Sequence, residues 1–257
     1  MATFVSPDWV AERIGQPGYL LIDPRSAMRY LMGHLRGAVS VPYKKLQAPD
    51  GRLGPPEQLA AAFGDVGLGD DVTPILYDHQ DGRNAAMAAW VLEYLGRADV
   101  HIMDLRYEAW KDAGREVLYR PVVTRGANFT VRLNPAIRAT LDDVANAGAA
   151  TLVDARTTEE FRGEFEMDHR PGHIPGAVSL PHADLAGAGG NLYAGQDTLR
   201  ERLAGAGISQ GEPVIAYCRS GVRAAVTWLA LEQMGYDARL YDGSYAEWMD
   251  SDQPVET

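Results

Sequence analysis

Cysteine is almost absent from this chain, because its 257 residues include only Cys218. A single cysteine excludes an intramolecular disulfide and fits a reducing compartment. The N-terminal stretch has neither the basic region nor the apolar region of a secretory signal, and no apolar run approaches the roughly 20 residues of a membrane span. We therefore expect a cytoplasmic protein with no membrane partner.

Positive charge is also scarce, since 24 Lys and Arg residues face 35 Asp and Glu residues and give a net charge of -11. Phosphate contacts are made by clustered cations, so this balance argues against a nucleic-acid partner. Hydrophobic residues make up 46% of the chain, which is enough for a sizeable core. The composition indicates a globular protein of one large domain or two ordinary ones.

An internal repeat decides between these two possibilities. The segment Leu20-Leu-Ile-Asp23-Pro-Arg25 recurs as Thr151-Leu-Val-Asp154-Ala-Arg156, and GHLRGAVSVP at 33–42 recurs as GHIPGAVSLP at 172–181. A repeat of this length predicts two domains of ordinary size. We place the N-terminal domain at 1–116 and the C-terminal domain at 134–257, with a linker at 117–133 that shows no helical period.

Each half alternates short apolar runs with amphipathic stretches. Strands are expected at 20–22, 38–41, 75–77 and 100–103, and again at 152–153, 177–180, 214–217 and 239–241. Helices are expected at 58–63, 84–95, 199–204 and 222–234. This alternation predicts an α/β fold, in which each half is a mostly parallel sheet flanked by helices.

The position of Cys218 separates it from an ordinary buried cysteine, which is usually a small inert hydrophobe. It follows an apolar strand and precedes a helix, and ligands of parallel sheets bind where strands end. Arg219, Arg223 and the start of the helix favour a thiolate. Gly221 allows a tight turn, whose successive amides form an anion-binding site. Cys218 is therefore a candidate nucleophile.

Four motifs occur in order in the C-terminal half: Asp154-Ala-Arg156, Gly172-His-Ile-Pro-Gly-Ala177, Tyr217-Cys-Arg-Ser-Gly-Val-Arg223 and Asp242-Gly-Ser-Tyr-Ala-Glu-Trp248. Together these motifs resemble those of the tandem rhodanese sulfurtransferases. The resemblance implies two rhodanese-like domains with catalysis in the C-terminal one. Cys218 would take a sulfane sulfur from thiosulfate as a persulfide and pass it to cyanide or a thiol acceptor. The resemblance implies no metal and no organic cofactor.

The resemblance also implies roles for the residues around the nucleophile. The amides of the loop would stabilise the thiolate and the transferring sulfur, and two guanidinium groups would hold the small anionic sulfur donor. These substrate-binding candidates are Arg219, Ser220, Gly221, Val222 and Arg223, and the possible supporting residues are Asp154, Arg156, Arg162 and Arg170. The last two lie in the segment 161–170, which could bring a further cation to the site.

The N-terminal half departs from this pattern at the nucleophile. Alignment of the two halves puts Asp78 or His79 opposite Cys218, and neither side chain can carry a persulfide. We interpret the N-terminal half as a supporting domain.

Other functions fit the cysteine loop less well or remain open. Phosphatases that resemble this fold have five residues between Cys and Arg, whereas four separate Cys218 from Arg223. Zinc binding by His169 and His173 is disfavoured because Pro171 and Gly172 interrupt a helix between them. A redox-sensing or protein-binding module that uses the same exposed thiol remains an alternative.

The sulfur donor is the second open question. Relatives that use 3-mercaptopyruvate typically have Gly after the cysteine and an Arg six residues after the Asp of Asp-x-Arg. Here these positions hold Arg219 and Glu160. Both differences favour thiosulfate, and 3-mercaptopyruvate sulfurtransferase is the alternative.

Overall fold

The chain forms two compact units in a computed structural model that describes residues 1–165 and 168–257. The first unit contains residues 1–134 and 187–193, and the second contains 135–186 and 194–257. The segment 117–133, predicted to be a linker, belongs to the first unit. Within it the strand β7 (Val117–Leu118) pairs antiparallel with β3 (His34–Leu35), and the N–H of Arg132 donates to the carbonyl of Leu95 at 2.9 Å.

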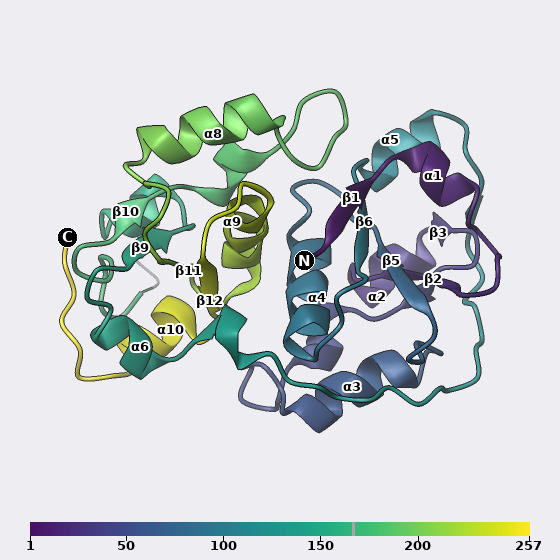
Figure 1. Ribbon diagram of the computed structural model, residues 1–257, viewed down its shortest axis with the longest axis horizontal. Coiled ribbons are helices and arrows are strands. Elements are labelled where there is room, and N and C mark those ends of the chain that lie inside the picture. Colours follow the sequence, from purple (N-terminus) through teal and green to yellow (C-terminus); the bar gives the residue numbers. More distant parts are fainter. Residues whose placement is uncertain (166–167) are drawn as a thin grey trace. The chain divides into compact units, whose positions relative to one another are not determined.

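The first unit is built on a five-stranded parallel sheet with the order β1-β6-β5-β2-β4 (Figure 1). Its strands are β1 (Thr3–Val5), β2 (Tyr19–Asp23), β4 (Val39–Ser40), β5 (Thr73–Leu76) and β6 (His101–Met103). Its helices are α1 (Pro7–Ala11), α2 (Ala27–Leu31), η1 (Tyr43–Leu46), α3 (Pro56–Gly64), α4 (Arg83–Tyr94) and α5 (Tyr107–Asp112).

The second unit repeats this sheet with the order β8-β12-β11-β9-β10, again all parallel. Its strands are β8 (Arg138–Ala139), β9 (Thr151–Asp154), β10 (Val178–Ser179), β11 (Val214–Tyr217) and β12 (Ala238–Tyr241). Its helices are η2 (Pro135–Ile137), α6 (Leu141–Ala145), α7 (Thr158–Phe161), η3 (His182–Leu185), α8 (Gln196–Gly205), α9 (Val222–Gln233) and α10 (Ser244–Met249). The matching strand orders confirm the predicted α/β fold with two parallel sheets.

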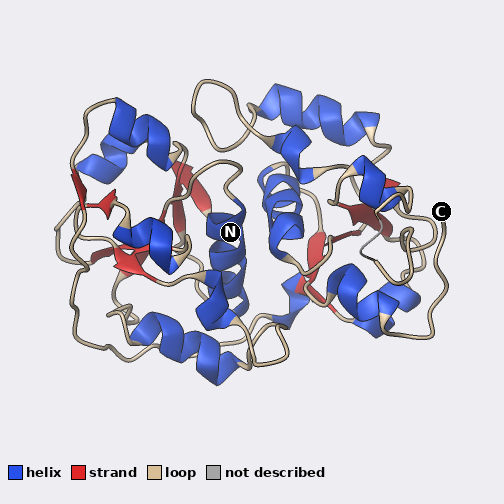
Figure 2. Cartoon of the chain, turned by 180° about the vertical axis from the view of Figure 1, so that it is seen from behind, coloured by secondary structure: helices blue, strands red, loops and turns tan. Residues whose placement is uncertain are grey.

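Helices cover both faces of each sheet (Figure 2). In the first unit α1 and α5 share a core with one sheet face, and α4 contacts β5 and β6. In the second unit α6 and α10 share a core with one sheet face, and α9 contacts β11 and β12. Alternate strand residues face opposite sides, so strands covered on both faces are apolar throughout, as β11 is.

The predicted strands and longer helices lie within a few residues of those in the structure. The strands and helices that the sequence did not predict are short, such as β8 with two residues and α7 with four. Segments of this length do not complete enough of a period to be recognised. Among the helices in the described ranges, none combines the length and the apolar character that a membrane span requires.

Candidate active site

The predicted loop lies at the junction between β11 and α9. The strand ends at Tyr217 and the helix begins at Val222, so Cys218, Arg219, Ser220 and Gly221 form the turn at the carboxyl edge of the sheet. Gly221 has φ +86°, and a Cβ there would lie 3.1 Å from the carbonyl oxygen of Asp242. This turn therefore requires glycine. Cys218 itself is 1% exposed, so the expectation of an exposed thiol, on which the redox-sensing alternative rests, is wrong.

The first residues of α10 hold the loop backbone. The N–H of Tyr245 donates to the carbonyl of Cys218 at 2.9 Å, and the N–H of Ala246 donates to the carbonyl of Arg219 at 3.0 Å. Because the C=O and N–H of a trans peptide point in opposite directions, the N–H groups of Arg219 and Ser220 point away from α10. The backbone of the loop is thus oriented by hydrogen bonds from the neighbouring helix.

Arg223, in the first turn of α9, is paired with Glu160 of α7. Its two terminal nitrogens donate to the two carboxylate oxygens at 2.5 and 2.8 Å. Burial opposes the charge on Arg223, but the hydrogen bonds to Glu160 and the electrostatic interaction with Cys218 raise its pKa. Burial also favours the neutral form of Glu160, but hydrogen bonds from Arg223 and from the N–H of Thr157 lower the pKa of this carboxyl group. Sequence reasoning identified Glu160 only as a difference from relatives.

Replacing Glu160 by glutamine is expected to lower the free energy of unfolding by roughly 2 kcal/mol at pH 7, because a charged hydrogen-bond pair is lost. The folded state lowers the pKa of Glu160 below its usual 4.5, so the ionised carboxylate stabilises the fold above that pH. This contribution is lost as pH falls through the folded-state pKa. Urea unfolding at several pH values measures it, with the exposed Glu57→Gln as control. A stability difference from the unmodified chain that persists unchanged at low pH would contradict the assignment.

Arg219 is paired with a second acid, Asp168, whose side chain is 1% exposed. Nη1 of Arg219 lies 3.0 Å from Oδ1 of Asp168, an ion pair without the angles of a hydrogen bond. Nη1 of Arg156 lies 3.4 Å from Oδ2 of the same carboxylate. The segment 161–170 was expected to bring a further cation to the site. Instead it brings an acid to Arg219, and residues 166–167 lie outside the described residues.

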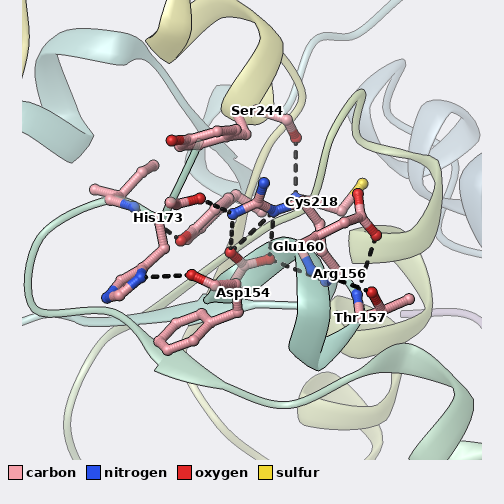
Figure 3. Close-up of polar contacts among 12 residues, drawn as sticks. Asp154, Arg156, Thr157, Glu160, His173, Cys218 and Ser244 are labelled. Atoms are coloured by element: carbon pink, nitrogen blue, oxygen red, sulfur yellow. Dashed lines mark hydrogen bonds and ion pairs between the residues drawn. The ribbon is translucent and has the colours of Figure 1, made fainter. Parts of the chain in front are cut away.

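The four supporting candidates lie in different surroundings. Arg156 and Asp154 form a fully buried pair, with Nη2 of the arginine 2.7 Å from Oδ2 of the aspartate and 2.7 Å from the carbonyl of Gly172 (Figure 3). The guanidinium of Arg170 donates to the carbonyls of Met249, Ser251 and Gln253. Arg162 is exposed. The buried pair supports the strand edge beneath the loop, and Arg170 holds the segment after α10.

The corresponding position in the first unit is Asp78. The N–H of Tyr107 donates to the carbonyl of Asp78 at 2.8 Å, which matches the bond from Tyr245 to Cys218. The Asp78 carboxylate accepts hydrogen bonds from the N–H groups of His79, Asn84 and Ala85 at 2.7 to 2.9 Å. The structure therefore selects Asp78 over His79 as the counterpart of Cys218. A carboxylate of the protein fills the anion-binding turn of this copy.

The fold and the site define a class of protein with two α/β units in tandem, in which the second unit carries a cysteine at a strand-to-helix turn. The model of the rhodanese-like domain matches this chain twice, over residues 6–113 and 138–251, and the chain belongs to that family.

Individual relatives of known name match nearly the whole chain. The putative thiosulfate sulfurtransferase SseB of Mycobacterium tuberculosis is 38% identical over 248 residues, which cover 91% of this chain and 87% of that protein. The 3-mercaptopyruvate sulfurtransferase of Escherichia coli is 32% identical and covers 98% and 97%. The crystal structure of SseA from Escherichia coli, described as a 3-mercaptopyruvate sulfotransferase, superposes with a TM-score of 0.87 at 31% identity, covering 95% of this chain and 99% of that one.

Proposed function

We propose that this protein is a sulfurtransferase that carries a sulfane sulfur on Cys218. The observation that carries the proposal is the position of the only cysteine, in a turn between β11 and α9 and close to the charge of Arg223. Relatives named as sulfurtransferases that match nearly the whole chain support it. A reducing cytoplasmic location, which keeps the single thiol reactive, is part of the proposal.

The chemistry consists of two displacements at sulfur. The Cys218 thiolate attacks the outer sulfur of thiosulfate, and the bond between that sulfur and the sulfonate sulfur breaks. Sulfite leaves with the electron pair, and Cys218 becomes a persulfide. A cyanide ion or a thiolate then attacks the outer sulfur of the persulfide, which releases thiocyanate or a new persulfide and restores the Cys218 thiolate.

The loop residues stabilise the charge that moves through these steps. Backbone N–H groups from Arg219 to Arg223, including those of Ser220, Gly221 and Val222, face the negative charge on sulfur as an oxyanion hole faces oxygen. Arg223 and Arg219 supply positive charge to a small anionic donor, and each is held by one acid, Glu160 or Asp168. Asp154 and Arg156 keep the end of β9 in place next to the loop.

Thiosulfate is the proposed donor in preference to 3-mercaptopyruvate. The side chain at position 160 is a carboxylate that already binds Arg223, so this position supplies no cation to bind the carboxylate of 3-mercaptopyruvate. We expect kcat/KM to be about tenfold higher for thiosulfate, the scale of one lost charge-assisted hydrogen bond. Steady-state rates with both donors at equal cyanide concentration measure the ratio. A higher kcat/KM for 3-mercaptopyruvate would reject this donor assignment.

A further inference from the structure

Ser244, the first residue of α10, has a backbone conformation that is unusual for serine. Its φ is +54°, and among the described residues only one other non-glycine residue, Gln80, has a positive φ. A side chain in this region crowds its own backbone, so the conformation costs free energy and persists only where surrounding contacts enforce it. Ser244 is completely buried. The surrounding contacts therefore hold a strained residue next to the loop.

The hydroxyl of Ser244 is bound to the nucleophile's own backbone. It accepts a hydrogen bond from the N–H of Cys218 at 3.2 Å and donates one to the carbonyl of Tyr241 at 2.7 Å. Figure 3 shows the hydroxyl of Ser244 pointing to the backbone nitrogen of Cys218, whereas the sulfur of Cys218 points away from this hydroxyl. The next residue, Tyr245, binds the carbonyl of Cys218. Both the N–H and the C=O of the nucleophile are thus held from the start of α10.

The duplicated first unit provides an internal comparison. Ser244 corresponds to Arg106, which precedes Tyr107 as Ser244 precedes Tyr245. Arg106 has an ordinary φ of −65°, and its N–H donates to the carbonyl of Gly190. The bond from Tyr107 to Asp78 is nevertheless kept. The fold therefore needs the backbone bond in both units, but the strained serine occurs only in the unit that has the cysteine.

We propose that Ser244 is a positioning residue for Cys218, in the sulfurtransferase function proposed above. Its hydroxyl binds the N–H of Cys218 and so fixes the first peptide group of the loop. This fixes where the sulfur lies relative to the amides from Arg219 to Arg223. Both displacements require an attack along the S–S bond axis, so a small rotation of Cys218 slows each of them. The strained backbone is the cost of bringing the hydroxyl to that position.

The test separates the hydroxyl from the strain by comparing two variants. Ser244→Gly removes the hydroxyl and adopts φ +54° without strain, whereas Ser244→Ala removes the hydroxyl and keeps the strain. We expect both variants to form the Cys218 persulfide about tenfold more slowly in single-turnover mixing with thiosulfate. We expect the Tm of Ser244→Gly to be at least as high as that of Ser244→Ala. KM for thiosulfate should change less than kcat.

Two controls make the result specific. Arg106→Gly changes the corresponding position of the first unit and should leave the rate of persulfide formation unchanged. The rate at which a neutral alkylating agent modifies Cys218 reports the position of the sulfur without any sulfur donor, and it should change in Ser244→Gly. Wild-type rates of persulfide formation and alkylation in Ser244→Gly would overturn the proposal. If the unmodified protein forms no persulfide, the sulfurtransferase function fails, and the alkylation rates still decide whether Ser244 positions Cys218.

Discussion

Replacing Cys218 by serine is expected to reduce sulfur transfer by at least about a thousandfold, the scale on which loss of a nucleophile acts. A serine hydroxyl is not ionised near neutral pH and cannot form a persulfide, so neither displacement can begin. The substitution changes one buried atom, and the free energy of unfolding should fall by no more than about 1 kcal/mol. Thiocyanate formation from thiosulfate and cyanide measures the activity.

The position of Asp78 gives this experiment a matched control. Asp78→Asn alters the corresponding residue of the first unit and should leave turnover unchanged, because the carboxylate there only fills its own turn. In the unmodified protein, mass spectrometry after incubation with thiosulfate should detect one added sulfur atom, and in Cys218→Ser none. Turnover that survives in Cys218→Ser would refute the persulfide mechanism. Reversible oxidation of Cys218 without any turnover in the unmodified chain would favour the redox-sensing alternative.

The sequence predicted the fold and the cysteine loop because both depend on local patterns. The apolar run of β11 and the turn residue Gly221 lie next to Cys218 in the chain, so the strand, the turn and the nucleophile could be recognised together. The repeat then indicated that the same domain occurs twice. The sequence alone does not decide whether Asp78 or His79 corresponds to Cys218. The hydrogen bond from the N–H of Tyr107 to the carbonyl of Asp78 identifies Asp78 as the counterpart.

The partners of the loop could not be predicted, because they come from distant parts of the chain. Glu160 lies 63 residues before Arg223, and nothing in the spacing shows that their side chains meet. Asp168 lies in a segment that is present only in the C-terminal half. The distance in sequence between matching residues of the two halves increases from 131 at Asp23 to 139 at Gly33, so the C-terminal half has eight additional residues there. The positive φ of Ser244 could not be predicted either, because serine gives no sequence signal for a left-handed backbone.

The second large effect is expected in stability, from Arg156→Met. This substitution removes a buried guanidinium and leaves the carboxylate of Asp154, which is 0% exposed, without its ion-pair partner. An uncompensated buried charge costs about 3–5 kcal/mol. We expect the free energy of unfolding, measured by urea denaturation, to fall by about that amount. Asp154→Asn together with Arg156→Met removes both charges and should recover part of the loss.

The duplicated pair in the first unit separates stability from activity. Arg25 and Asp23 form the same buried pair, with Nη2 of the arginine on the carbonyl of Gly33 in place of Gly172. Arg25→Met should therefore destabilise the protein to a similar extent. Arg156 also contacts Asp168, the acid that holds Arg219, whereas the first unit has no counterpart of this segment. KM for thiosulfate should therefore rise in Arg156→Met and stay unchanged in Arg25→Met, measured on folded protein. Equal KM values in the two variants would mean that the buried pair supports the fold alone and has no effect on the donor site.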